Sequence, residues 1–184
     1  MKNCIFIPIL FLLSVVPAQA DDNPAEPPPV KYRVTGLFSP DRQDDLREVM
    51  KKLPEVKLVS IDYKNAEATF IFDANKLFNR PKPEQIVERF DNLIRTNSAA
   101  TFGIRPLCTT PRDKLKLIEI GVVGLDCKGC SLGAYEAISK IDGVEQATAS
   151  FKEGLVTALI DPAKTNRAVL EEALKKKNVA LKAP

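Results

Sequence analysis

Histidine and tryptophan are both absent from the chain, and the lack of histidine removes the usual general base of enzymes. Without imidazole the sequence has no Ser/His/Asp triad, no Cys/His protease site and no zinc site with a histidine ligand. The side chains left for reactive chemistry are carboxylates, lysines and four cysteines. On this evidence we expect a protein that is not an enzyme.

An excess of charge of either sign is also lacking. The 27 Lys and Arg residues nearly balance the 24 Asp and Glu residues, and the net charge of +3 is spread along the sequence rather than gathered in one basic block. We therefore expect no nucleic-acid partner, because such partners require clustered positive charge. The hydrophobic content of 45% is enough for a packed core.

The longest apolar run lies at the N-terminus. Lys2 precedes the run at residues 5–16, and the AQA at 18–20 has the small-x-small pattern of a signal-peptidase site. The run is shorter than the ~20 residues that cross a bilayer, which disfavours the alternative of an uncleaved membrane anchor. We predict that residues 1–20 are a signal peptide. The mature protein would then be periplasmic or secreted, carry no membrane-inserted segment and retain three of the cysteines.

Proline-containing segments divide the rest of the chain. Residues 21–29 hold four prolines and no apolar periodicity, which predicts an extended tether. A second break falls at residues 106–114, where prolines and polar residues interrupt the apolar pattern and predict a linker. The sequence therefore predicts two domains, at residues 30–105 and 115–184.

The two predicted domains repeat one another. Residues 30–76 align without a gap on residues 118–164, with apolar positions matching apolar positions. Each copy has an alternating strand pattern, a helical i, i+3, i+4, i+7 pattern and two further strand patterns around a turn. A second helix, expected over residues 83–96 and 166–177, and a short apolar tail complete each copy. We predict an α+β fold of two tandem ferredoxin-like βαββαβ domains, each a four-stranded antiparallel sheet with two helices on one face.

The second copy carries a cysteine motif between its first strand and its first helix. Residues 124–130 read GLDCKGC, the helix exit at 141–144 reads IDGV, and the turn at 152–154 reads KEG. On these motifs, residues 115–181 resemble the heavy-metal-associated (HMA) domain family, which includes periplasmic mercury-binding proteins and copper chaperones. The resemblance implies a ferredoxin-like fold that binds a soft metal ion through the two cysteines. It also implies transfer of the ion to a metal-transporting membrane protein or to another metal-binding domain.

The residues of the loop suit this chemistry. Cys127 and Cys130 are three positions apart, so that two sulfurs converge on one ion when the second lies in the first helical turn. The helix N-terminus and Lys128 both favour thiolate over thiol. Two sulfurs without histidine favour near-linear Cu(I) or Hg(II) over tetrahedral zinc, which needs further ligands. The family usually has methionine where Leu125 stands, and leucine has a similar volume for packing beneath the loop.

Other interpretations of the cysteines stay open. The CxxC motif also occurs in thiol-disulfide redox proteins, although the tryptophan that often precedes it there is missing. A structural disulfide in an interaction module is a third possibility in an oxidising compartment. Cys108, in the predicted linker, is expected to be an incidental exposed thiol rather than a ligand. Residues 175–177 are three lysines that are expected either to be solvated at a helix end or to approach the metal loop.

The corresponding loop of the first copy has lost both sulfurs. Ser39 stands at the position of Cys127 and Arg42 at that of Cys130, and neither side chain binds a soft cation. We predict a degenerate HMA-like domain without CxxC that serves as a spacer or docking surface. If the sulfurs are the only deficit, cysteines at both positions should create a second site. The acidic residues at this helix start are expected to compensate the helix dipole: Asp41, Asp44 and Asp45.

Overall fold

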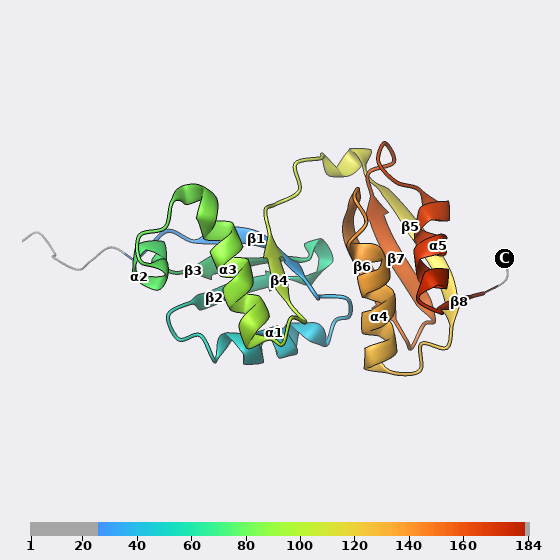
Figure 1. Ribbon diagram of the computed structural model, residues 1–184, viewed down its shortest axis with the longest axis horizontal. Coiled ribbons are helices and arrows are strands. Elements are labelled where there is room, and N and C mark those ends of the chain that lie inside the picture. The colour runs from blue at the N-terminus through green and yellow to red at the C-terminus, as the bar shows by residue number, and fades with distance from the viewer. Residues whose placement is uncertain (1–25, 183–184) are drawn as a thin grey trace, which may run out of the picture.

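The computed structural model describes residues 26–182 (Figure 1). The predicted signal peptide, residues 1–20, and the first part of the predicted tether lie outside the described residues. Within residues 26–182, no helix is both long enough and apolar enough to cross a membrane. Two four-stranded sheets with their helices make up this part of the chain, and we call them the first module (residues 30–105) and the second module (residues 116–182).

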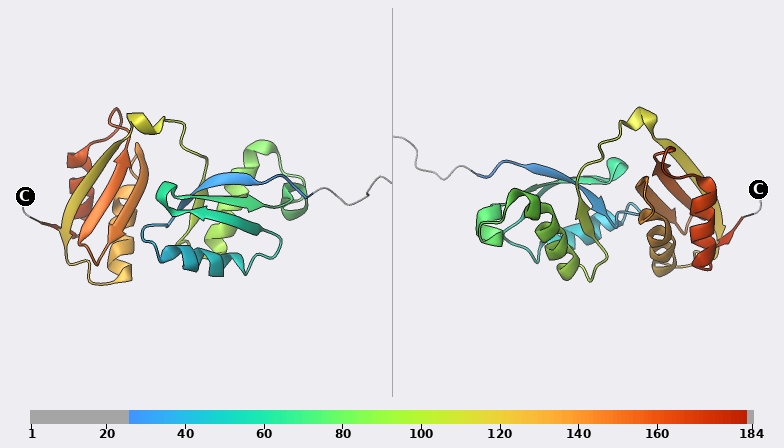
Figure 2. Two further views of the ribbon diagram at one scale, coloured as in Figure 1. Left: turned by 180° about the vertical axis from the view of Figure 1, so that it is seen from behind. Right: turned by 45° about the horizontal axis from the view of Figure 1, so that its top comes forward.

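The first module is an antiparallel sheet in the strand order β2-β3-β1-β4. Helices α1 and α3 cover one face of this sheet (Figures 1 and 2). Helix α1 buries Leu46, Val49 and Met50, at the spacing predicted for an amphipathic helix. The elements are β1 (Val30–Thr35), α1 (Arg42–Met50), β2 (Lys57–Asp62), β3 (Glu67–Ile71), α3 (Pro83–Asn97) and β4 (Gly103–Arg105).

The second module has the same strand order, β6-β7-β5-β8, and is also antiparallel. Helices α4 and α5 lie on one face of the sheet and contribute the buried residues Ala134, Ile138, Leu170 and Leu174. The predicted α+β class and the ferredoxin-like βαββαβ arrangement are therefore confirmed for both modules. The elements are β5 (Lys116–Val123), α4 (Lys128–Ser139), β6 (Val144–Ser150), β7 (Leu155–Ile160), α5 (Arg167–Lys176) and β8 (Ala180–Leu181).

The two modules share their strand register as well as their order. Val30 pairs with Phe70 in the first sheet, and the residues 88 positions later, Ile118 and Ala158, pair in the second. The loop after the first strand turns on a glycine in both: Gly36 has φ +95° and Gly124 has φ +80°. At Gly36 a side chain would also meet the carbonyl oxygen of Thr101, so only glycine fits there.

The cores of the two modules differ in composition. The first is aromatic: Phe70 and Phe90 are both 0% exposed and meet edge-on, with ring centroids 5.1 Å apart. Each such ring stabilises the fold by ~1.5–3 kcal/mol of apolar burial. The second sheet presents alanines to its helices, with Ala149 and Ala158 almost fully buried. Small side chains on β6 and β7 leave room at the edge of this core for an aromatic ring from the other module.

One helix of the first module was not predicted from the sequence. Helix α2 (Ala74–Phe78) lies where the aligned repeat ends, at residue 76, before the helix expected from residue 83, and no element was expected there. Asp73 caps it by accepting the N–H groups of Asn75 and Lys76, and Asn79 ends it in the left-handed conformation. The chain between the modules is irregular apart from a short 3-10 helix, Arg112–Lys114.

Candidate metal centre

The cysteine motif begins at the N-terminus of α4. Cys127 is the N-cap residue of this helix, with extended backbone angles, and its Sγ accepts the N–H of Cys130 at 3.1 Å. The thiol thus occupies the position that Ser, Thr or Asp usually takes at a helix start. Beneath the loop Leu125 is only 5% exposed, as expected from the sequence. The local fold therefore brings one sulfur to the loop and the other to the first turn of the helix.

The two thiols have different acidities. Hydrogen bonds from the Cys130 side chain and then from the Cys130 backbone N–H lower the pKa of Cys127. The same side-chain contact with Cys127, followed by burial, raises the pKa of Cys130. Cys127 is also the more exposed of the two. The pair therefore consists of an exposed sulfur whose pKa is lowered and a less exposed neighbour whose pKa is raised, and an ion that binds both releases their protons.

Cys108 lies apart from this pair. Its Sγ donates to the carbonyl oxygen of Thr110 at 3.4 Å, and burial and then Glu145 raise its pKa. In the described chain, no group of three or more His, Cys, Asp or Glu side chains comes together as a metal site, and the three cysteines there are free thiols. The geometry accordingly offers two sulfurs to an ion, without a third cysteine.

An open groove of about 450 Å³ adjoins the cysteine loop. Cys130 and Leu125 lie on one side, and Lys177 and Val179, from the turn between α5 and β8, lie on the other. Of the three lysines considered in the sequence analysis, only Lys177 lines this groove in the described structure. Lys176 forms an ion pair with a neighbour in its own helix, Glu172, at 2.8 Å. One lysine thus approaches the site, while a second is solvated and paired.

The corresponding loop of the first module is organised by Arg42. Its Nη1 lies 2.6 Å from an oxygen of Asp45, and its Nε donates to the carbonyl oxygen of Gly36 at 3.1 Å. The guanidinium group also lies over the ring of Phe102, with 4.1 Å between its carbon and the ring centroid. The sequence analysis treated Arg42 only as a charge that repels cations. In the structure, this side chain also fastens the loop to the first module.

The helix start has also changed in the first module. The Arg42 N–H bonds to the carbonyl oxygen of Ser39 at 3.1 Å, which is a tighter turn than that at Cys127, while the Ser39 hydroxyl donates to Asp41 at 2.6 Å. Asp41 is the N-cap residue and already has helical backbone angles. The premise that the missing sulfurs are the only deficit of this loop was therefore wrong, because the turn that would carry them has a different hydrogen-bond pattern.

The loop of the first module docks onto the second module, which the sequence analysis did not specify. Phe38 is 3% exposed and belongs to the core of the second module, where its ring centroid lies 5.5 Å from that of Tyr135. The Phe38 carbonyl oxygen accepts the N–H of Ala149 at 3.0 Å, and the Gly36 N–H donates to the Tyr135 hydroxyl at 2.8 Å. One feature of the sequence indicated this docking: the repeat aligns the apolar Phe38 with the charged Asp126, so the first loop has an apolar side chain where the second has a charge.

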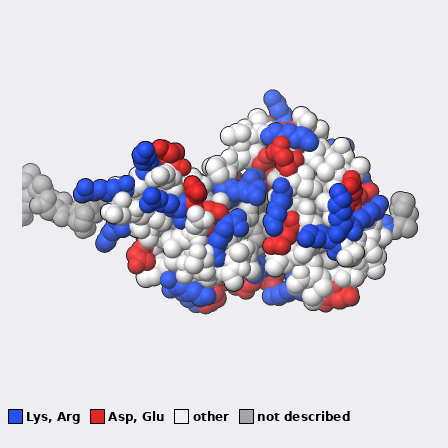
Figure 3. All heavy atoms as spheres, in the orientation of Figure 1, with Lys and Arg blue, Asp and Glu red and all other residues white. Residues whose placement is uncertain are grey.

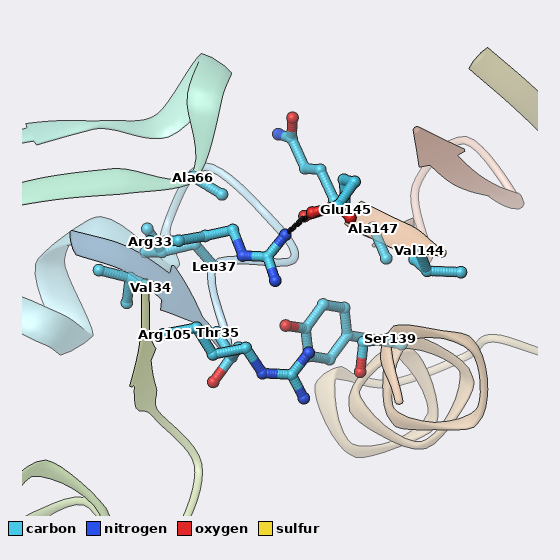
Figure 4. Close-up of a pocket in the computed structure, with 12 residues that line it drawn as sticks. Arg33, Val34, Thr35, Leu37, Ala66, Arg105, Ser139, Val144, Glu145 and Ala147 are labelled. Atoms are coloured by element: carbon cyan, nitrogen blue, oxygen red, sulfur yellow. Dashed lines mark hydrogen bonds and ion pairs between the residues drawn. The ribbon is translucent and has the colours of Figure 1, made fainter. Parts of the chain in front are cut away.

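Charged residues border this interface (Figure 4). Arg33 of β1 forms an ion pair with Glu145 of β6, and both side chains are largely buried. The pair lines a small cavity of about 20 Å³ between the modules, which also touches Arg105 and Tyr135. A cavity of this size holds about one water molecule and no larger ligand. This part of the interface is therefore packed rather than a binding cleft.

Asp41 connects the first module directly to the cysteine motif. Its carboxylate lies 2.6 Å from the Nζ of Lys128, the residue that follows Cys127. Hydrogen bonds from Lys128 and then from Ser39 lower the pKa of Asp41, and the carboxylate in turn raises the pKa of Lys128. Asp41 lies at the N-cap of its own helix, where a charge that compensates the dipole was expected, and in addition it has a partner in the other module.

Several solved structures are similar to this chain. The chain is similar to the CopZ metallochaperone (22% identity, 36% of this chain and 100% of that chain, TM-score 0.36). It is also similar to oxidized MerP from Ralstonia metallidurans CH34 (25%, 37% and 94%, TM-score 0.35). The N-terminal soluble domains of CopA from Bacillus subtilis match over 84% of this chain and 92% of that chain (18% identity, TM-score 0.35). The comparison with curated proteins gives no match.

The family comparison covers the segment with the cysteines. Residues 119–178 match the family of the heavy-metal-associated domain. This range runs from β5 to just beyond α5. The assignment of the first module to the same family remains a prediction from the repeat. Residues 119–178 thus match the heavy-metal-associated domain, as the GLDCKGC motif predicted.

Proposed function

We propose that the protein captures a soft metal ion, Cu(I) or Hg(II), with Cys127 and Cys130 and passes it on by thiolate exchange. The observation that carries the proposal is the position of these sulfurs: Cys127 caps α4 and Cys130 lies in its first turn. The family match of residues 119–178 agrees with metal binding. Soft thiolates select such ions, and two of them suit near-linear coordination.

The difference between the two thiols suggests an order of events. Cys127 is exposed and has the lowered pKa, so its thiolate meets the incoming ion first. Cys130 then gives up its proton to solvent as its sulfur binds the ion. For release, a thiolate of the acceptor replaces one sulfur and then the other. The acceptor is a metal-transporting membrane protein or another metal-binding domain, and no bond other than metal–sulfur is made or broken.

The site of action follows from the predicted signal peptide. With residues 1–20 removed, the protein is periplasmic or secreted and acts outside the cytoplasm. Thiols tend to be oxidised there, so capture of an ion requires the reduced pair. The intact mass of the exported protein tests this part. A product that starts at Asp21 agrees with it, and one that still carries Met1 contradicts it.

Titration of the reduced mature protein tests the metal site. One equivalent of Cu(I) or Hg(II) should bind per chain. The double variant Cys127→Ser, Cys130→Ser should lose high-affinity binding and stay folded, because Cys127 is exposed and Cys130 is only partly buried. Cys108→Ser is the matched control and should bind as wild type. Unchanged affinity in the double variant would show that the ion binds elsewhere.

A redox function is the second candidate, and the unequal pKa values of the two cysteines are the observation that favours it. An unequal pair is also what a dithiol oxidoreductase needs for attack on a disulfide. Rapid catalysis of insulin reduction by wild type, abolished by Cys127→Ser, would favour that function. Inert protein that binds one ion per chain would favour metal capture.

A further inference from the structure

The first module places a carboxylate against the side chain of a residue in the cysteine loop. Asp41 is 2.6 Å from the Nζ of Lys128, and this lysine is the first of the two residues between the cysteines. An exposed ion pair of this kind contributes little by itself, because solvent screens the two charges. Its importance here depends on whether Asp41 is held in place by other contacts.

The docking loop provides those contacts. Phe38, three residues before Asp41, is buried in the second module, and its carbonyl oxygen is bonded to Ala149. The N–H of Gly36 donates a hydrogen bond to the Tyr135 hydroxyl. A chain of three residues spans no more than ~11 Å, so anchoring at Phe38 keeps Asp41 beside the cysteine loop. Arg42 fixes the other end of the same loop.

We propose that Asp41 is a specificity-determining residue: by cancelling the charge of Lys128 it shifts the preference of the cysteine site from soft monovalent toward soft divalent cations. This inference rests on the proposed function. It adds that the first module, which has no cysteine pair of its own, sets the charge of the ion that the second module prefers. In this role Asp41 touches neither ion nor sulfur and acts through its charge, which offsets that of Lys128.

The reason is the charge of the loaded site. Two thiolates with a monovalent ion such as Cu(I) carry one net negative charge, whereas two thiolates with a divalent ion such as Hg(II) are neutral. A free lysine beside the site therefore stabilises the monovalent complex more than the divalent one. With Asp41 paired to Lys128, this advantage is removed. The neighbouring Asp126 is unchanged in all the variants compared, so its charge does not affect the differences between them.

The ratio of the two affinities isolates this effect. Both ions displace protons from the same two thiols, so any change in thiol acidity cancels when the affinities are divided. A unit charge on the order of 7 Å away, at an effective dielectric constant of ~40–80, changes such a ratio by about three- to sevenfold. This is the size of change to be measured.

The experiment compares Cu(I) and Hg(II) affinities in Asp41→Asn, each measured by competition with a chelator of known affinity. Asparagine is equally suited to the N-cap position of α1, so the helix start is kept. We expect the ratio of Cu(I) to Hg(II) affinity to rise about three- to sevenfold, and less in ~1 M salt, where exposed charges are screened. Asp44→Asn is the matched control, because Asp44 pairs with Arg47 inside its own helix. Its ratio should stay at the wild-type value.

A second variant tests the part played by Lys128. Lys128→Gln removes the positive charge, so the ratio of Cu(I) to Hg(II) affinity should fall, opposite in sign to the effect of Asp41→Asn. An unchanged ratio in the single variant Asp41→Asn, or an equal change in Asp44→Asn, would overturn the inference while metal capture stands. A ratio that rises in Lys128→Gln would also overturn it. Wild-type protein that binds neither ion would overturn the proposed function and this inference together.

Discussion

The loops at residues 36–42 and 124–130 occupy the same place in two modules of the same topology, yet they have opposite environments. The second loop is open to solvent and presents two sulfurs beside a groove. The first is closed: Arg42 fills it from within, and Phe38 leaves its own module to join the core of the other. The comparison teaches that a βαββαβ module without its cysteines can use the same loop for docking.

The two loops differ less in the charge of their surroundings than in how they pack. Positive and negative side chains are interspersed over the face of the molecule seen in Figure 3, and no single-sign patch covers either module there. The contacts that hold the modules together include an aromatic ring, two hydrogen bonds to the backbone, one largely buried ion pair and the exposed ion pair of Asp41 with Lys128. The following predictions test this division of roles, from the largest expected effect to the smallest.

Removal of the Phe38 ring should have the largest effect. Phe38→Ala leaves a cavity at the edge of the second core, so we expect a loss of ~3–5 kcal/mol in the free energy of unfolding of the full chain, measured in urea. Phe151→Ala is the control, because that ring is 40% exposed and its removal should cost less than ~1 kcal/mol. Equal losses in the two variants would contradict the docking of Phe38.

Conversion of the first loop into a cysteine loop should fail. Ser39→Cys with Arg42→Cys removes the bonds of Arg42 to Gly36 and Asp45 and keeps the tight turn at residue 39. We expect ~1–3 kcal/mol of destabilisation and one bound ion per chain, as in wild type. The measurements are urea unfolding and Cu(I) titration. Two ions per chain in a folded variant would show that the two loops differ in their sulfurs alone.

Loss of one hydroxyl should weaken the interface by a smaller amount. Tyr135→Phe leaves the buried N–H of Gly36 without its acceptor, at a cost of ~1–2 kcal/mol in the free energy of unfolding. Tyr63→Phe is the matched control, since its hydroxyl makes no hydrogen bond within residues 26–182. Similar stability of the two variants would mean that the bond between Gly36 and Tyr135 contributes nothing.

The contribution of Asp41 to stability should be the smallest and should depend on pH. The folded-state pKa of Asp41 is lowered, so the ion pair stabilises the protein above the ordinary carboxyl pKa, and the effect disappears as the pH falls through the folded-state value. We expect Asp41→Asn to lower the free energy of unfolding by less than ~1 kcal/mol at neutral pH, because the pair is exposed. At a pH well below the lowered pKa of Asp41, the urea midpoints of variant and wild type should coincide. A difference that grows in acid would contradict this sign.

The strands and main helices were predictable because both copies carry the same periodicity. Alternation around Val30 and Ile118 sets which face of each strand is buried, and the repeat sets the register. Helix α2 was missed because it is only five residues long and depends on the cap at Asp73 rather than on an apolar pattern. The pairing of the two cysteines with a helix start followed from their spacing and place in the chain.

The interface was beyond the reach of sequence patterns. Phe38 stands in a loop, where no periodicity indicates whether a side chain packs within its module or against another one. Arg42 was judged by its charge alone, although its side chain is also held by Phe102, which lies far from it in the sequence. Contacts between distant segments depend on how the modules are placed, and local sequence does not encode that placement.

The burial of Phe38 makes the two modules thermodynamically dependent on each other. A cut in the connection at residues 106–114 would expose this ring on one fragment and leave the edge of a core open on the other. The fragments would then hold complementary surfaces, and their association could be followed by calorimetry as a bimolecular equilibrium. In the intact chain the connection supplies this association as a high effective concentration, so that the docking loop stays bound without any need for high intrinsic affinity.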